Sequence, residues 1–217
     1  TGFLSYRSKV WQNTSRGGLP KIFLEDMNFE KYVDMSLGTP LLFVMQNDKY
    51  LSANGKTFKD FMDGNIQLIK NKKPTFKDFE NHLATIFTEV RLKKYIEIRS
   101  LDTCEWSCHC SGPAFYTGLL YGALDESLEI INKWNKQDIL NAYIEAPKKG
   151  LNTIINNKSI LEWSEILLNL SKKGLQKRNI KNKNGKDESV FLESIENTIS
   201  SKKTKAEKIL ENFDKKK

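Results

Sequence analysis

The sequence contains few of the features that mark secreted or membrane proteins. All three cysteines of its 217 residues lie between Cys104 and Cys110, so the evenly spread pairs of a disulfide framework are missing. No apolar run approaches the roughly 18–20 residues of a membrane helix, and the first residues do not resemble a signal peptide. These absences favour a reducing compartment, and we expect a cytoplasmic protein without a membrane partner.

Most of the chain also lacks an excess of either charge. The formal net charge is +8, but residues 171–217 contain 14 of the 35 basic residues against 7 of the 27 acidic ones. Phe191 and Phe213 are the only aromatic residues of this Lys-rich tail, too few to interleave with its lysines as stacking on nucleic-acid bases would need, so a solvated surface is the simpler interpretation. We therefore expect no nucleic-acid partner.

The pattern of apolar residues predicts an α+β protein, with strands in the first half and helices in series afterwards. Hydrophobic residues make up 39% of the chain, enough for a substantial core. We expect a strand or extended edge over 2–13 and a strand over 95–102. We expect a hairpin over 40–55, turning at Gln46–Lys49, and helices over 28–38, 113–134, 137–150, 159–178 and 190–213.

The five residues Thr-Phe-Lys-Asp-Phe occur twice, at Thr57–Phe61 and at Thr75–Phe79. Each copy places Asp three residues after Thr, a variant of the sequence that begins many helices. The match does not extend beyond five residues. It predicts two helix N-termini and no domain repeat.

The strand at 95–102 places Glu97 and Arg99 on one face, roughly 6.5–7 Å apart along the strand. In one interpretation they form an ordinary surface pair. In the other, the carboxylate holds a divalent metal ion and the guanidinium holds phosphate oxygens in one cleft. The periodicity alone leaves both open. Arg91 and Lys93 alternate with Tyr95 just before, and we expect them to be exposed.

The cluster Cys104, Cys108, His109 and Cys110 raises a third possibility, a small zinc-stabilised binding module. Known zinc fingers use two separated pairs of ligands. Adjacent residues at 108–110 would converge poorly on one tetrahedral ion, so the spacing argues against zinc. His82, alone on a predicted helix, is expected to be structural.

The chain resembles the glutamate–cysteine ligase family of the plant and proteobacterial type. The similarity is carried by "HLATIFTEVRLKKYIEIRSLD", Trp106 and "CSGPAFYTGLLY". It extends upstream, in the family's order, through "YRSKVW", "LPKIF", "NFEKYVDMSLGTPLLFV" and "KYLSANGKTFKDFMDG".

The resemblance implies an ATP- and Mg²⁺-dependent ligase that phosphorylates the γ-carboxyl of L-glutamate and joins it to the amine of L-cysteine. This is the first step of glutathione synthesis. The implied fold is a curved antiparallel sheet backed by helices, related to the glutamine synthetase catalytic fold. A different acceptor amine is the alternative within the same fold.

The resemblance also implies roles for individual residues. Glu97 matches a metal-binding glutamate and Arg99 a phosphate-facing arginine. Arg7, Trp11 and Tyr32 match motifs that line the substrate cleft, and Asp102 closes the strand motif. These last four are equally compatible with packing, pairing or turn-capping roles.

The chain departs from the family in length and in its cysteines. Family members of this type are about twice as long, so we expect a C-terminal fragment that needs the N-terminal half of the same protein. We expect residues 1–122 to belong to the catalytic domain and 123–217 to form its helical C-terminal region. Cys104, Cys108 and His109 stand where the family generally has neither residue type.

Overall fold

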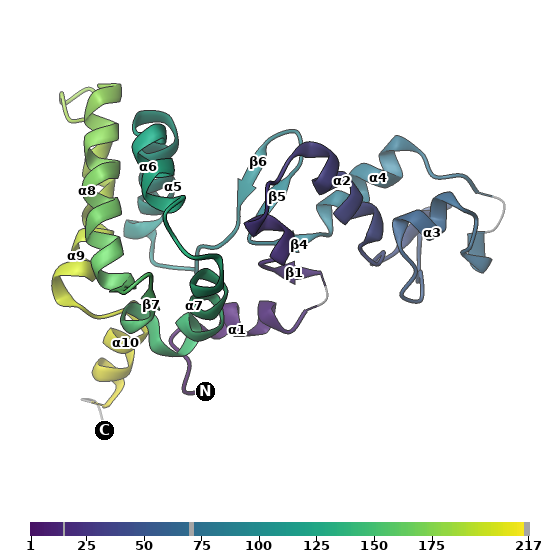
Figure 1. Cartoon of the computed structure of the whole chain (residues 1–217), viewed down its shortest axis with the longest axis horizontal. Helices are drawn as coiled ribbons and strands as arrows, with labels where there is room; N and C mark the ends of the chain where they lie inside the picture. The colour runs from purple at the N-terminus through teal and green to yellow at the C-terminus, as the bar shows by residue number, and fades with distance from the viewer. Residues whose placement is uncertain (15, 70–71, 215–217) are drawn as a thin grey trace. The chain divides into compact units, whose positions relative to one another are not determined.

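The computed structural model describes residues 1–14, 16–69 and 72–214 (Figure 1). It divides into two compact units. Unit 1 comprises residues 1–9 and 101–217, and unit 2 comprises residues 10–100. Helix α1 (Tyr6–Gln12) contains the first point at which the chain passes from one unit to the other, between residues 9 and 10. No helix in the described part of the chain is long and apolar enough to cross a membrane.

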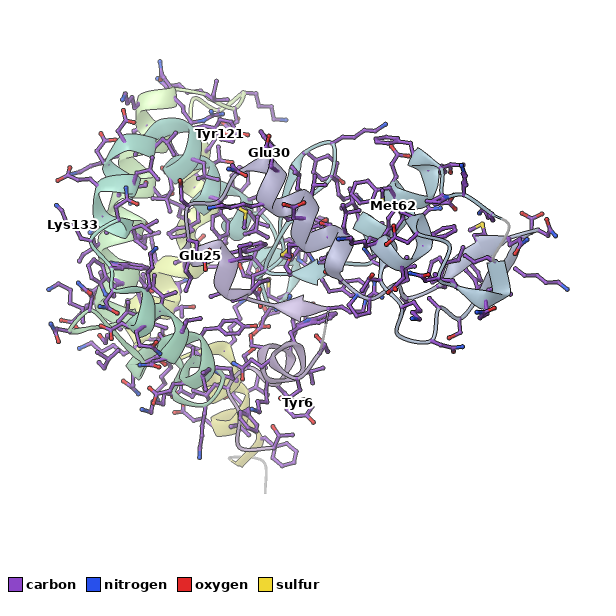
Figure 2. All side chains as sticks on the ribbon, turned by 45° about the vertical axis from the view of Figure 1, so that its right-hand side comes forward. Tyr6, Glu25, Glu30, Met62, Tyr121 and Lys133 are labelled. Carbon is purple, nitrogen blue, oxygen red and sulfur yellow. A yellow bond between two sulfur atoms is a disulfide. The ribbon has the colours of Figure 1, made fainter. Side chains whose placement is uncertain are left out.

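Unit 2 is built from short helices and paired strands. Its elements are β1 (Gly17–Gly18), η1 (Lys21–Leu24), α2 (Phe29–Gly38), β2 (Val44–Gln46), β3 (Lys49–Leu51), α3 (Phe58–Met62), η2 (Gln67–Ile69), α4 (Phe76–Ala84), β4 (Phe87–Thr88), β5 (Val90–Leu92) and β6 (Ile96–Ile98). β1 pairs with β4 in parallel, whereas β2–β3 and β5–β6 are antiparallel hairpins. Helix α2 exposes Glu30 (Figure 2) and buries Tyr32 and Ser36.

The core of unit 2 forms around α3. Its buried side chains are Leu41, Val44, Ala53, Phe58, Phe61, Ile66 and Ile69. Both predicted helix starts are confirmed, because Thr57 and Thr75 each form a complete capping box with the Asp three residues later. The predicted hairpin is also confirmed. Its turn residues Asn47 and Asp48 both have positive φ, as tight hairpin turns require.

Unit 1 is mainly helical. Its elements are η3 (Trp106–Cys108), α5 (Ser111–Thr117), the π-helical turn η4 (Gly118–Gly122), α6 (Leu124–Ile131), α7 (Lys136–Lys149), η5 (Gly150–Asn152), β7 (Ile154–Ile155), β8 (Lys158–Ser159), α8 (Ile160–Arg178), η6 (Glu188–Leu192), α9 (Glu193–Ser201) and α10 (Lys205–Asp214). In Figure 1, α8 runs beside α5 and α6.

The helices of unit 1 meet closely where η4 crosses α8. A Cβ on Gly118 would lie 2.3 Å from the carbonyl oxygen of Ser171, and a Cβ on Gly174 would lie 2.1 Å from that of Gly118. Only glycine permits this approach. Nearby, Leu175 and Leu192 are completely buried, so the crossing joins a packed core.

Three predicted elements differ from the structure. The predicted helix at 113–134 is divided into α5, η4 and α6, because Ala123 leaves the helical conformation. The predicted strand at 2–13 is wrong, because Tyr6–Gln12 form helix α1; Ser5 Oγ accepts a hydrogen bond from the Ser8 amide at 3.3 Å, an N-cap arrangement. The predicted helix at 190–213 is broken into η6, α9 and α10. Lys202 takes a left-handed conformation that ends α9, and Thr204 caps α10 with Glu207.

The mixture of helices and small sheets confirms the α+β class. The described strands form four two-stranded sheets, so a continuous curved sheet stays a prediction. The boundaries between the two compact units fall after residues 9 and 100 and not at residue 122. The predicted assignment of 1–122 and 123–217 to parts of one catalytic domain likewise remains a prediction.

Candidate active site

The candidate site is centred on the β5–β6 hairpin of unit 2. In its register, Arg91 lies directly opposite Glu97, flanked by the apolar pairs Val90–Ile98 and Leu92–Ile96. Neighbouring residues of a strand point to opposite faces. The hairpin therefore has one charged face and one apolar face.

Arg91 holds Glu97 from the opposite strand. Its Nη2 and Nε lie 2.6 and 2.8 Å from Glu97 Oε2. Its Nη1 donates to the carbonyl oxygens of Ala84 and Ile86, and the residue is only 6% exposed. The expectation that Arg91 is exposed is therefore wrong.

Arg99 holds the other oxygen of the same carboxylate. Its Nη1 lies 3.1 Å from Glu97 Oε1, so the two predicted residues are in direct contact. The Glu97 side chain remains 29% exposed between the two arginines. Partial burial opposes its ionisation, but the hydrogen bonds and charge of Arg91, followed by those of Arg99, outweigh burial and lower the pKa of Glu97. An ionised, partly accessible carboxylate is the form that binds a hard cation.

An aromatic stack supports Arg99. Its guanidinium lies over the Phe87 ring at 5.5 Å, and the ring of Trp11 packs against Phe87 at 5.3 Å. The backbone N–H of Arg99 also donates to Glu89 O at 2.8 Å, which continues the hairpin pairing beyond β6. Trp11 thus bears on the site indirectly, by packing against the aromatic ring beneath Arg99.

Tyr32 belongs to the apolar side of the hairpin. Its hydroxyl accepts a hydrogen bond from the Leu92 amide at 3.0 Å. Burial raises the pKa of Tyr32, although this bond and the charge of Arg91 oppose the shift. Its ring helps to line an apolar hollow of about 670 Å³. The hollow is lined by Leu19, Phe23, Met27, Asn28, Phe29, Tyr32, Val90, Leu92 and Ile96.

Arg7 and Asp102 lie in unit 1, where their side chains form an ion pair of 3.8 Å. The structure therefore brings these two predicted residues to each other. Glu97, Arg99, Trp11 and Tyr32 lie in unit 2.

His82 is a structural residue of unit 2. Its Nε2 lies 2.7 Å from Ser36 O, and its ring stacks on Phe58. Burial lowers the pKa of His82, so the neutral ring donates its Nε2 proton to that carbonyl. This agrees with the sequence expectation.

The described residues contain no group of three or more His, Cys, Asp or Glu side chains that could hold a metal ion. In the cysteine cluster, Cys104 and Cys108 form a disulfide and Cys110 is a free, exposed thiol. The sequence pattern does not predict this single short-range disulfide. The disulfide removes Cys104 and Cys108 as zinc ligands, so only His109 and Cys110 remain of the four ligands of the zinc-module alternative.

The site thus defines an α+β chain in which an ionised, partly exposed glutamate is held between two arginines. The chain belongs to the glutamate-cysteine ligase family 2, whose model matches residues 1–216. It is similar to "Glutamate--cysteine ligase, chloroplastic" of Solanum lycopersicum, with 37% identity over 97% of this chain and 40% of the relative. The similarly named A form of Oryza sativa subsp. indica is 39% identical over 99% of this chain and 44% of the relative.

Two conclusions follow from these relatives. The chain spans about two fifths of the length of the curated relatives it matches, in agreement with the expected fragment. The expectation of a cytoplasmic protein is wrong, because the relatives, including the one from Arabidopsis thaliana at 36% identity, are named chloroplastic.

Proposed function

We propose that this chain is part of an ATP- and Mg²⁺-dependent ligase that joins the γ-carboxyl of L-glutamate to the amine of L-cysteine. The observation that carries the proposal is the Arg91–Glu97–Arg99 cluster, in a chain that belongs to the glutamate-cysteine ligase family. By analogy with the relatives named chloroplastic, we place the protein in a plastid.

Phosphorylation would convert the unreactive γ-carboxyl into an acyl phosphate, and the ligation then needs positive charge around the transferring phosphoryl group. Mg²⁺, when bound, supplies part of that charge. Glu97 would serve as one of its ligands, and Arg99 would pair with phosphate oxygens. Arg91 would keep Glu97 ionised and aimed at the cleft.

The donor set of this chain fits one ligand of such a metal rather than a complete site, since the described residues contain no three-residue metal cluster. We infer that other parts of the longer ligase supply the remaining carboxylates and part of the nucleotide pocket. Arg7, Trp11, Tyr32 and Asp102 stay proposed substrate-cleft residues.

The exposed surface of the hairpin supports the same inference. Ile96 is 67% exposed and Phe29 74% exposed beside the apolar hollow. The outer edge of β6 has no strand partner among the described residues. We infer that the rest of the ligase polypeptide covers this face and extends the hairpin into the curved antiparallel sheet.

The test is an assay of ATP-dependent γ-glutamylcysteine formation by the full-length protein and by its Glu97→Gln variant. We expect the variant to lose at least about a hundredfold in kcat, by analogy with loss of a key electrostatic group. We expect the 217-residue chain alone to be inactive. Normal turnover by the variant would overturn the role of Glu97, and robust turnover by the isolated chain would overturn the fragment proposal. A rate with another amine equal to the rate with L-cysteine would favour the alternative acceptor.

A further inference from the structure

A polar hollow in unit 1 borders the Cys104–Cys108 disulfide. Its volume is about 530 Å³. It is lined by Thr103, Cys104, Glu105 and Ser107 of the loop, Val190 and Phe191 of η6, Glu193, Ser194, Asn197 and Thr198 of α9, and Lys205, Lys208, Ile209 and Asn212 of α10. None of these residues takes part in the proposed ligation.

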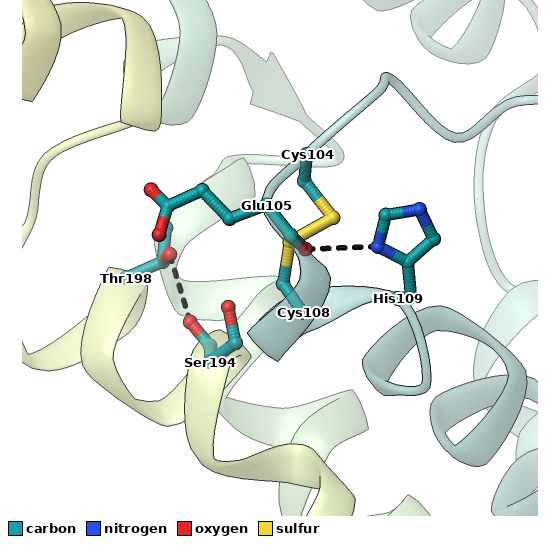
Figure 3. The surroundings of a disulfide bond; sticks show 6 residues. All are labelled: Cys104, Glu105, Cys108, His109, Ser194 and Thr198. Atoms are coloured by element: carbon teal, nitrogen blue, oxygen red, sulfur yellow. Dashed lines mark hydrogen bonds between the residues drawn. A yellow bond between two sulfur atoms is a disulfide. The ribbon is translucent and has the colours of Figure 1, made fainter.

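The two sulfur atoms of the disulfide differ in access from this hollow. Cys104 is partly exposed and belongs to the lining, whereas Cys108 is 6% exposed and does not. Figure 3 shows the disulfide with the Glu105 side chain, Ser194 and Thr198 on one side and His109 on the other. A molecule in the hollow would therefore meet Cys104 first.

The hollow offers charges of both signs as well as neutral polar groups. Lys205 and Lys208 come from α10, while Glu105 and Glu193 come from the loop and α9. The lining also includes the hydroxyl and amide side chains of Thr103, Ser107, Ser194, Asn197, Thr198 and Asn212. This lining suits a small molecule that carries both a carboxylate and an ammonium group.

A second hollow touches the disulfide from a different set of residues, including Arg7, Asp102 and both cysteines. Its two opposite charges are already paired with each other, at 3.8 Å. It is therefore the less suitable place for a zwitterion.

We propose that the first hollow binds a small zwitterionic thiol whose sulfur exchanges with the Cys104–Cys108 disulfide. The thiol loses its proton, and the thiolate attacks Cys104 Sγ. A new bond joins the two sulfurs, and the Cys104–Cys108 bond breaks with its electron pair on Cys108 Sγ, which takes up a proton. The products are a mixed disulfide on Cys104 and a thiol on Cys108, so no external oxidant or reductant is consumed.

The leaving sulfur already has a hydrogen-bond acceptor. Cys108 Sγ lies 3.0 Å from the carbonyl oxygen of Glu105, in the same turn. The thiol formed there can donate to this oxygen without a rearrangement of η3. In a second exchange, the thiolate of another small thiol would attack the small-molecule sulfur of the mixed disulfide. A bond forms between the two small-molecule sulfurs, and the bond to Cys104 Sγ breaks with its electron pair on Cys104 Sγ, which takes up a proton. Over both steps, two small thiols are oxidised to their disulfide and both cysteines are reduced.

The experiment uses the full-length protein with the Cys104–Cys108 disulfide formed, without ATP. Three probes are compared: L-cysteine as the zwitterion, cysteamine as the cation and 3-mercaptopropionate as the anion. Acid quenching, alkylation and peptide mass spectrometry measure the rate and the residue modified, and rates are corrected for thiolate fraction. We expect L-cysteine to react about fivefold faster at low concentration, a factor typical of one or two surface charges, and its rate to saturate.

Variants separate binding in the hollow from simple collision. A Lys205→Ala, Lys208→Ala double variant should remove the advantage of L-cysteine, whereas Lys148→Ala, outside the hollow, should keep it. Cys110→Ser should leave the rate unchanged. Equal, unsaturated rates for the three thiols, modification at Cys108 instead of Cys104, or failure of the Cys104–Cys108 pair to form would each overturn the proposal. None of these outcomes bears on the ligase proposal.

Discussion

The β5–β6 hairpin and the Cys104–Cys108 loop follow one another in the sequence but are stabilised by different forces. In the hairpin, Arg91 and Arg99 hold Glu97 by charge and hydrogen bonds. In the loop, a covalent bond joins Cys104 to Cys108. The contacts of Glu97 can rearrange without breaking a covalent bond. The loop changes state only through sulfur chemistry. The hairpin should therefore respond to charge and pH, and the loop to thiols.

The largest effect should come from Arg91. Arg91→Met removes a buried cation that also bonds two carbonyl oxygens, and breaking such a buried pair costs about 3–5 kcal/mol of unfolding free energy. Denaturant unfolding of the chain measures the loss. Arg178→Met is the matched control, because the Arg178–Glu188 pair is more exposed and should be worth under about 1 kcal/mol. Equal losses for the two variants would remove the distinction between a buried and a surface pair.

The disulfide should contribute less. Cys104→Ser opens a very short loop, and loop-closure entropy predicts a loss of about 2 kcal/mol. The free Cys110 provides the control, since Cys110→Ser breaks no bond and should change stability little. Adding a dithiol reductant to the unsubstituted chain should reproduce the loss. Unfolding curves that do not respond to reductant would contradict the prediction.

Arg99 should have a smaller effect on stability than either. Its pair with Glu97 is partly exposed, and its stack on Phe87 adds a modest cation–π interaction, so Arg99→Met should cost about 1 kcal/mol. The same unfolding assay measures it. A loss as large as that of Arg91→Met would show that the two arginines are equivalent, contrary to their difference in burial.

The smallest effect is the share of the pH dependence that comes from the hairpin. Because the pKa of Glu97 is lowered in the folded state, its contribution is complete above the ordinary glutamate pKa of about 4.3. The contribution is lost as the pH falls through the lower folded value. Glu97→Gln should therefore flatten the acid side of the stability curve, and Cys104→Ser should not. Parallel curves for the Glu97 variant and the unsubstituted chain would contradict this.

Local signals predicted local structure well. The two Thr-Phe-Lys-Asp-Phe segments form the same capping box, since that bond pattern depends only on residues three apart. Their burial differs, however: Phe58 is 4% exposed and Phe76 is 77% exposed. Burial depends on what packs from elsewhere in the chain, and the five residues carry no such information.

The candidate site was predicted only in part, because strand periodicity is a local signal and contacts between strands are not. Strand periodicity placed Glu97 and Arg99 on one face, and the structure joins them at 3.1 Å. Arg91 was missed because its importance arises from the partner strand: the signal was an opposite charge across a tight turn at 93–95. The cysteine pairing was missed because counting cysteines indicates a framework, not a single short-range bond.

The crossing of η4 over α8 has a consequence for how this sequence can vary. Gly118 and Gly174 meet through their backbones, so neither can gain a side chain while the other helix keeps its place. Substitutions at the two positions are therefore coupled to each other. A larger residue at either position would require a shift of a whole helix, because no nearby substitution could restore the lost space.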